Sequence, residues 1–142
     1  MRRRGLTLRR GALVLLVCLT SGAARADDIA DCNQQKDLDL RVRGCTALMK
    51  SPQLSAGDKA VVLQLRGNAY RVKRDYLSAL SDYIEAMPLA DDETVRRSTE
   101  AGIMMTLTQA PPELRATPIG KKAIDLMEKS FQKSKGGKPA PK

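Results

Sequence analysis

The stretch RGNAYRVKRDYLSALSDYIEAM, residues 66–87, contains every tyrosine of the chain together with several small residues. Where two antiparallel helices cross closely, the contact positions need small side chains, because only these let the backbones approach. The pattern therefore predicts a packed helix hairpin rather than a catalytic cluster, since no group of cations or carboxylates converges on the tyrosines. The residues predicted to pack this hairpin are Gly67, Tyr70, Ala79, Tyr83 and Ala86.

The remaining sequence also predicts helices, because no run of β-branched and aromatic residues alternates with polar ones. Breakers divide the pattern: Pro52 and Gly57 separate two helices, and Pro111 and Pro112 end another. Thr117 is predicted to cap the last helix, with Pro118 at its first position. The predicted fold class is all-α, a short array of two to three helix pairs over residues 27–133. Residues 134–142 are predicted to be a disordered Lys/Gly/Pro tail.

Helical spacing also predicts which residues are buried. The predicted apolar stripes comprise Val62, Leu65, Ala69 and Val72; Ile103, Met104 and Leu107; and Ile119, Ala123 and Leu126 or Met127, with Ser130 or Phe131 as a possible extension.

Residues 1–26 have the layout of a secretory signal peptide: arginines, a short apolar run over residues 12–19, and small residues around Ala24 and Ala26. The apolar run is shorter than the ~20 residues that a membrane span needs. We expect cleavage before Asp27 and a periplasmic protein; an uncleaved anchor is the alternative. Lipidation at Cys18 is disfavoured, because bulky Val17 precedes it.

The formal charge of +9 comes from 25 basic and 16 acidic residues, but these are unevenly distributed. Residues 1–26 hold six arginines and no acid, and residues 121–142 hold seven lysines and two acids. The segment between them has 12 basic and 14 acidic residues. A nucleic-acid binder needs a clustered basic face, so no nucleic-acid partner is expected.

Two cysteines, Cys32 and Cys45, remain after the predicted signal. An even pair in an exported chain predicts a disulfide, because the compartment is oxidising. Two free buried thiols are the alternative. A zinc site is disfavoured, since the chain has no histidine and two thiolates do not complete the coordination.

Residues 60–87 resemble a tetratricopeptide repeat (TPR), a helix pair of about 34 residues. Gly67 and Tyr70 match the Gly and Tyr of the family's first helix, and Ala79, Tyr83 and Ala86 match the small and aromatic positions of its second helix. The clear repeat covers about residues 58–91. The preceding segment is similar to a divergent copy, and this alignment places both cysteines at facing interior positions of one hairpin. As a whole the chain is similar to small exported TPR proteins of Gram-negative bacteria.

The resemblance implies that a partner protein or peptide binds the concave face lined by the first helix of each pair. In the clear repeat this face comprises Val61, Gln64, Asn68, Arg71 and Val72, of which Gln64, Asn68 and Arg71 are the candidate partner-binding residues. Asn68 matches an asparagine that some family members use to hold a peptide's terminal carboxylate, but Gln64 stands where that clamp has a lysine. An ordinary solvated face is the alternative.

We therefore expect a non-enzymatic protein-interaction module with no cofactor and no metal. A small enzyme is disfavoured, because the chain lacks histidine and the common catalytic motifs. A second alternative is a cell-envelope-surface protein that attaches to anionic lipid or cell-wall polymer through the basic C-terminal helix and tail. Self-association through residues 103–105 is a further alternative.

Overall fold

The computed structural model describes residues 20–136, and within this range all regular structure is helical. The predicted all-α class is confirmed. The elements in chain order are α1 (Thr20–Asn33), α2 (Leu38–Met49), α3 (Ala56–Val72), α4 (Tyr76–Ala86), the 3₁₀ helix η1 (Met87–Leu89), α5 (Glu93–Gln109), the 3₁₀ helix η2 (Pro112–Ala116) and α6 (Pro118–Gly136).

Short polar residues fix where the helices begin. Each accepts a hydrogen bond from a backbone N–H of the first turn, which has no partner inside the helix. The predicted cap of α6 is confirmed, because Thr117 Oγ1 accepts from the Gly120 N–H at 3.1 Å. The caps of α2 to α5 are Asp37, Ser55, Asp75 and Asp92.

The turn between α3 and α4 is a Schellman motif. The Asp75 N–H donates to Tyr70 O at 2.9 Å, and the Arg74 N–H donates to Arg71 O at 3.0 Å. Arg74 occupies the left-handed position, with φ of 64°. This position usually holds glycine, so Arg74 adopts it at a cost in backbone strain.

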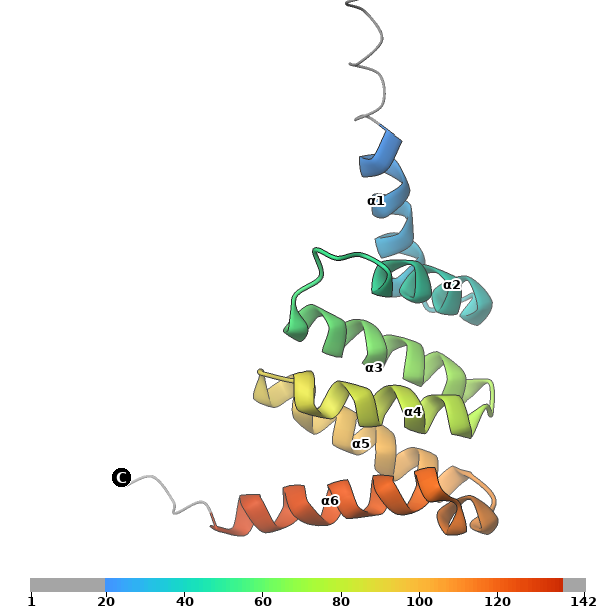
Figure 1. The fold of residues 1–142 in the computed structure, drawn as a ribbon. Helices are drawn as coiled ribbons and strands as arrows, with labels where there is room; N and C mark the ends of the chain where they lie inside the picture. Colours follow the sequence, from blue (N-terminus) through green and yellow to red (C-terminus); the bar gives the residue numbers. More distant parts are fainter. Residues whose placement is uncertain (1–19, 137–142) are drawn as a thin grey trace, which may run out of the picture.

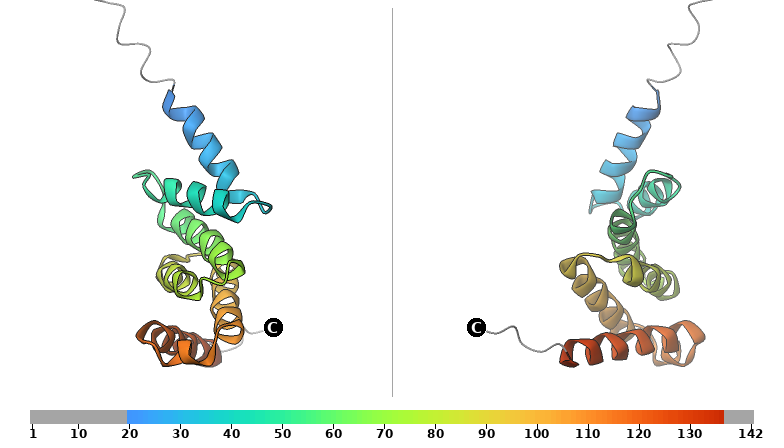
Figure 2. Two further views of the ribbon diagram at one scale, coloured as in Figure 1. Left: turned by 90° about the vertical axis from the view of Figure 1, so that its right-hand side faces the viewer. Right: turned by 60° about the vertical axis from the view of Figure 1, so that its left-hand side comes forward.

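The helices stack in an elongated array with α1 at one end and α6 at the other (Figure 1). Each of the helices α1 to α5 packs against the next, and α6 lies across the far end against α4, α5 and η2. Figure 2 shows α4 and α5 on opposite sides of the array below α3. This packing is compatible with the predicted helix hairpins.

The core of the array is centred on α4. Tyr83 and Leu80 of α4 are fully buried, together with Ile103 of α5 and Ala123 of α6. The predicted small contacts Ala79 and Ala86 are also fully buried. Gly67 is buried beside Tyr83, where an added Cβ would stand 3.0 Å from the tyrosine ring. The predicted packing role of these α3 and α4 residues agrees with their positions.

Two predicted burials are wrong. Val72, the last residue of α3, is 57% exposed. Of the two alternatives at the end of the α6 stripe, Ser130 is half-buried and Phe131 is 60% exposed. Met104 points outward on α5 beside fully buried Ile103. Residues 103–105 therefore do not form one exposed face, and only Met104 and Met105 could contact a second molecule.

The first and last helices extend past the predicted ends of the helical domain. α6 continues to Gly136, so residues 134–136 are helical rather than part of the predicted tail. α1 begins at Thr20 and spans the predicted cleavage position before Asp27. The rest of the predicted signal peptide, residues 1–19, and residues 137–142 lie outside the described residues. Among the described helices, none combines the length and apolar character required to cross a bilayer.

Candidate partner-binding face

The predicted partner-binding residues lie on the side of α3 that faces α5. Gln64, Asn68 and Arg71 recur at helical spacing, so their side chains share this side. All three are half-buried, and each makes a hydrogen bond to another helix. We refer to this surface, formed by Val61, Gln64, Asn68, Arg71 and Val72 of α3 with Met105 of α5, as the α3–α5 face.

Two of these residues connect α3 to α5. Gln64 Nε2 donates to Ser98 Oγ, and Arg71 Nη1 donates to Gln109 Oε1 at 3.0 Å. Arg71 Nε is buried and has no hydrogen-bond partner among the described residues. Gln64 and Arg71 therefore hold α3 and α5 in register through these hydrogen bonds. The sequence pattern did not predict this structural role.

Asn68 is different, because its partner belongs to the core. Tyr83 Oη donates to Asn68 Oδ1 at 2.8 Å. This bond fixes the amide plane and leaves Asn68 Nδ2 without a partner among residues 20–136. Burial of Tyr83 raises the pKa of its phenol, and nearby Arg71 offsets part of this rise. The phenol therefore stays protonated and remains a donor to Asn68 at neutral pH.

Exposed apolar side chains surround this amide. Val61 and Val72 flank Asn68 on the same stripe of α3, and they are 38% and 57% exposed. Met105, which is 50% exposed, lies on α5 between Ser98 and Gln109, the residues bonded to α3. The α3–α5 face thus combines an oriented amide donor with apolar surface.

A second contact that the sequence analysis missed connects three helices. Arg66 of α3 makes a bidentate pair with Asp82 of α4, with Nε–Oδ2 and Nη2–Oδ1 distances of 2.8 Å. Arg66 Nη1 also donates to Thr46 Oγ1 of α2 at 3.1 Å. The hydrogen bond to Asp82 raises the pKa of Arg66 despite its burial. Arg66 and Asp82 are 16 positions apart, in two helices separated by a turn, so no local sequence pattern indicates that they pair.

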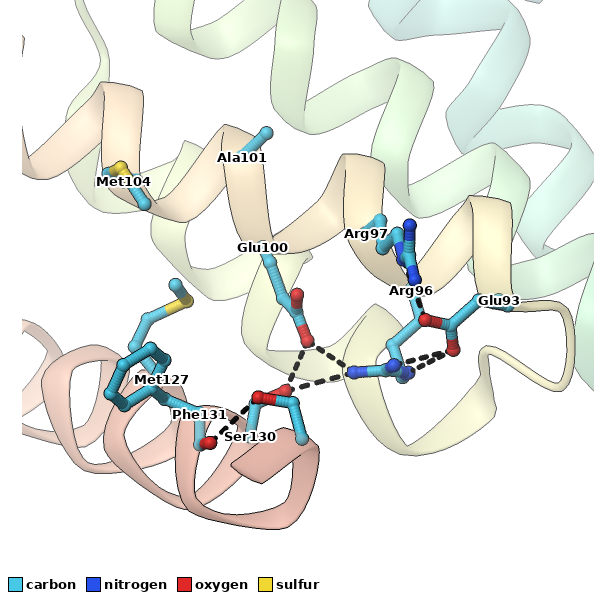
Figure 3. A pocket seen from close by; sticks show the side chains of 10 residues that line it. Glu93, Arg96, Arg97, Glu100, Ala101, Met104, Met127, Ser130 and Phe131 are labelled. Carbon is cyan, nitrogen blue, oxygen red and sulfur yellow. Dashed lines mark hydrogen bonds and ion pairs between the residues drawn. The ribbon is translucent and has the colours of Figure 1, made fainter. Parts of the chain in front are cut away.

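A pocket of about 420 Å³ lies between α5 and α6 (Figure 3). Its polar end contains Arg96, which pairs with Glu93 and Glu100, and Ser130 of α6 bonds to the same group. Its apolar end contains Met104, Met127 and Phe131. Because its charges are already paired with one another, this pocket lacks a free polar group to orient a ligand.

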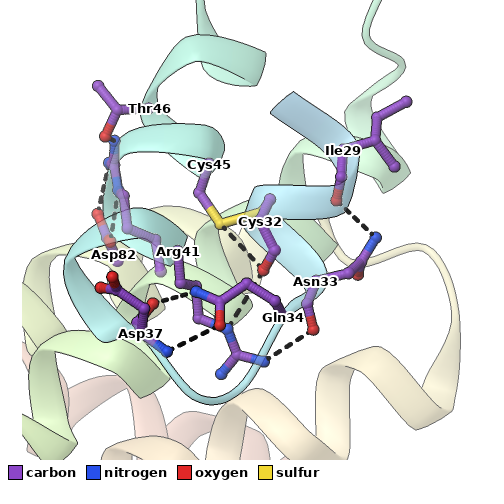
Figure 4. Close-up of a disulfide and its surroundings, with 10 residues drawn as sticks. Ile29, Cys32, Asn33, Gln34, Asp37, Arg41, Cys45, Thr46 and Asp82 are labelled. Carbon is purple, nitrogen blue, oxygen red and sulfur yellow. Dashed lines mark hydrogen bonds and ion pairs between the residues drawn. A yellow bond between two sulfur atoms is a disulfide. The ribbon is translucent and has the colours of Figure 1, made fainter. Parts of the chain in front are cut away.

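The predicted disulfide is present between Cys32 of α1 and Cys45 of α2, and both residues are buried (Figure 4). Arg41 supports the same hairpin, because its guanidinium donates to the last carbonyls of α1, those of Cys32 and Asn33. Gly44 permits the close approach, since a Cβ there would meet the Cys32 nitrogen at 2.7 Å. The alternative of two free thiols does not hold for this structure.

Within the described part of the chain, no three or more His, Cys, Asp or Glu residues come together in a group that could hold a metal ion. Comparisons with protein-family models, curated proteins and solved structures gave no match for this chain. The candidate site is therefore defined by the geometry of the α3–α5 face alone.

Proposed function

We propose that this protein is a non-catalytic, TPR-like interaction module that holds an extended segment of a partner protein on the α3–α5 face. One observation carries the proposal: Tyr83 fixes the Asn68 amide so that its nitrogen is free to donate, within a surface of exposed apolar side chains. An extended peptide presents backbone carbonyls between its side chains, which is the complement of such a surface.

Each residue has a defined role in this proposal. Asn68 Nδ2 donates to a carbonyl of the partner segment, while Val61, Val72 and Met105 contact its apolar side chains. Gln64 and Arg71 hold α3 against α5 through Ser98 and Gln109, so that the surface is formed before the partner arrives. Preorganisation of this kind lowers the entropic cost of binding.

We further propose that the protein acts in the periplasm. The signal-like sequence of residues 1–26 supports export, and the buried Cys32–Cys45 disulfide supports an oxidising compartment. In this compartment the cross-link stabilises the α1–α2 hairpin at one end of the array.

The test uses residues 27–142 as bait in a periplasmic extract, followed by affinity measurement with the purified partner. We choose Val72→Asp and Met105→Asp, because both side chains are exposed and their replacement leaves the core intact. The control is Leu77→Asp, a similar change at an exposed position of α4, outside the α3–α5 face. We expect the first two variants to lose affinity for the partner by about tenfold or more, because each buries the charge of an aspartate in an apolar contact with the partner.

Tyr83→Phe provides an independent measurement. This variant keeps the ring but removes the donor to Asn68, so the amide loses its fixed orientation. Binding should weaken by about fivefold, corresponding to one hydrogen bond of about 1 kcal/mol. Unchanged affinity in Val72→Asp, Met105→Asp and Tyr83→Phe, or equal loss in Leu77→Asp, would overturn the proposal.

A further inference from the structure

A groove lies between α6 and the end of α4. It runs along the other edge of α6 from the pocket between α5 and α6. Its volume is about 390 Å³. Its floor is apolar, formed by Ile84 of α4, Met87 of η1 and Leu126 of α6. We call it the α4–α6 groove. It shares no residue with the α3–α5 face, so it constitutes a separate surface of the molecule.

The rim of the α4–α6 groove is cationic. Lys122, Lys129 and Lys133 line it, all from α6. From Lys122 to Lys133 the helix rises about 16 Å, so the charges form a row along the groove rather than a single cluster. No carboxylate is among the residues that line the groove.

These lysines are available to a ligand. Within residues 20–136, neither Lys122 nor Lys133 lies within ion-pair distance of a carboxylate. Lys129 pairs with Asp125, but both side chains are more than half exposed, so this pair contributes little and is easily exchanged. Arg96 also lines the groove, but Glu93 and Glu100 already neutralise it.

We propose that the α4–α6 groove is a second docking site, which takes an acidic, amphipathic segment of a partner protein. The apolar floor takes leucine-like side chains, and the row of lysines pairs with carboxylates that flank them. A partner segment that matches a row of this length is at least three turns of helix or a short extended strand. The negative charge of the partner segment is opposite in sign to the charge of the lysine rim. This complementarity accelerates association and fixes the register of the segment in the groove.

The charge distribution on α6 favours a groove ligand over a membrane surface. By helical spacing, Asp125 lies on the outward side of α6 between the groove edge and Lys121, and Glu128 lies just beyond Lys121. An anionic bilayer lying on this helix would meet these carboxylates directly. A peptide in the groove meets the lysine edge, where the Asp125 carboxylate is already paired with Lys129, and stays away from Glu128.

The experiment measures fluorescence anisotropy of a panel of labelled synthetic peptides with the folded protein. Each peptide contains leucines spaced three, four or seven residues apart, with glutamates between them. Each has a matched version with glutamine in place of glutamate. We expect at least one acidic peptide to bind roughly tenfold more tightly than its glutamine version, with affinity that falls as salt rises. Equal binding of both versions, or no binding of any acidic peptide, would overturn the proposal.

Charge reversal locates the site. Lys122→Glu/Lys133→Glu reverses the groove rim, and Lys121→Glu/Lys135→Glu makes the same charge change outside the groove on the same exposed helix. The first pair should abolish binding of the acidic peptide, whereas the second should lower it by less than about threefold through screened long-range attraction. Circular dichroism confirms that both variants are folded. Equal losses in the two variants would assign the effect to net charge and overturn the groove.

The last measurement tests binding of the protein to anionic phosphatidylglycerol vesicles. If the protein binds vesicles through Lys122 and Lys133 but binds none of the acidic peptides, the groove is a lipid site and the proposal fails. These outcomes are independent of the α3–α5 face, because none of the residues changed to test that face, Val72, Met105 and Tyr83, lines the groove.

Discussion

The ring of Tyr83 lies so close to Gly102 that a Cβ on the glycine would stand 2.6 Å from two ring carbons. Gly67 borders the same ring from α3, where a Cβ would stand 3.0 Å away. The ring is thus enclosed between two glycines from helices that are not consecutive in sequence. Through its hydroxyl, this core residue also orients Asn68 on the α3–α5 face.

Gly102→Ala should destabilise the fold, although alanine favours helix over glycine by about 1 kcal/mol. The added methyl group overlaps a ring that cannot move, because Tyr83 is fully buried. We expect a net loss of about 1–2 kcal/mol in the free energy of unfolding, measured by urea denaturation. Gly67→Ala should cost less, since its contact is longer.

A double-mutant cycle with Tyr83→Leu separates the clash from other effects of the alanine. In this background the smaller side chain leaves room, so Gly102→Ala should become neutral or stabilising. The same loss in both backgrounds would show that the ring is not the cause.

Removal of the disulfide by Cys32→Ala/Cys45→Ala should lower the free energy of unfolding by about 3 kcal/mol in the chain-entropy model. The effect should be largest in α1, which the cross-link joins to α2 at the end of the array. Hydrogen exchange is expected to show loss of protection in α1 and α2, with α4 and α5 little changed. A uniform loss along the chain would contradict a local role.

The Arg66–Asp82 pair should be costly to break from one side. Asp82→Ala leaves the guanidinium of Arg66 buried without its carboxylate, so we expect a loss of about 3 kcal/mol or more in unfolding experiments. The double variant Arg66→Met/Asp82→Leu removes both charges and should recover much of this stability. If the double variant is as unstable as Asp82→Ala, the pair's hydrogen bond to Thr46 is the more important contact.

Arg74→Gly should stabilise the protein by about 1 kcal/mol, because glycine adopts the left-handed conformation without strain. Arg74→Ala removes the same charge but keeps the Cβ, so its stability should be close to that of the parent. Thermal unfolding of both variants distinguishes backbone strain from charge. Equal stabilisation by both would assign the gain to charge.

Acid should weaken the start of α5. The backbone N–H groups of Val95 and Thr94 bond to the Asp92 carboxylate and lower its pKa. A lowered folded-state pKa gives stability that is present above the ordinary aspartate pKa of about 4 and is lost as pH falls below it. Asp92→Asn keeps an amide cap without this titration. The stability difference between parent and variant should therefore shrink below about pH 4, whereas a constant difference would contradict this account.

Local sequence signals determined most of the helices. The breakers around Pro52 and Pro111, the Thr117 cap and the helical periodicity act within a few residues, so they could be interpreted without the fold. The small and aromatic residues from Gly67 to Ala86 likewise predicted a tight hairpin, since a close helix crossing requires them. The cysteine pair predicted the cross-link, because two cysteines remain after the predicted signal peptide and an exported chain is expected to lie in an oxidising compartment.

Contacts between distant segments were decided only by the tertiary structure. Periodicity placed Val72 and Met104 on apolar stripes, but whether a neighbouring helix covers a stripe depends on where that helix lies. The same is true of the Arg66–Asp82 pair, of the bonds from Gln64 and Arg71 to α5, and of the lysine-rimmed groove beside α6. These features depend on distances between helices, which packing sets and which no single helix encodes.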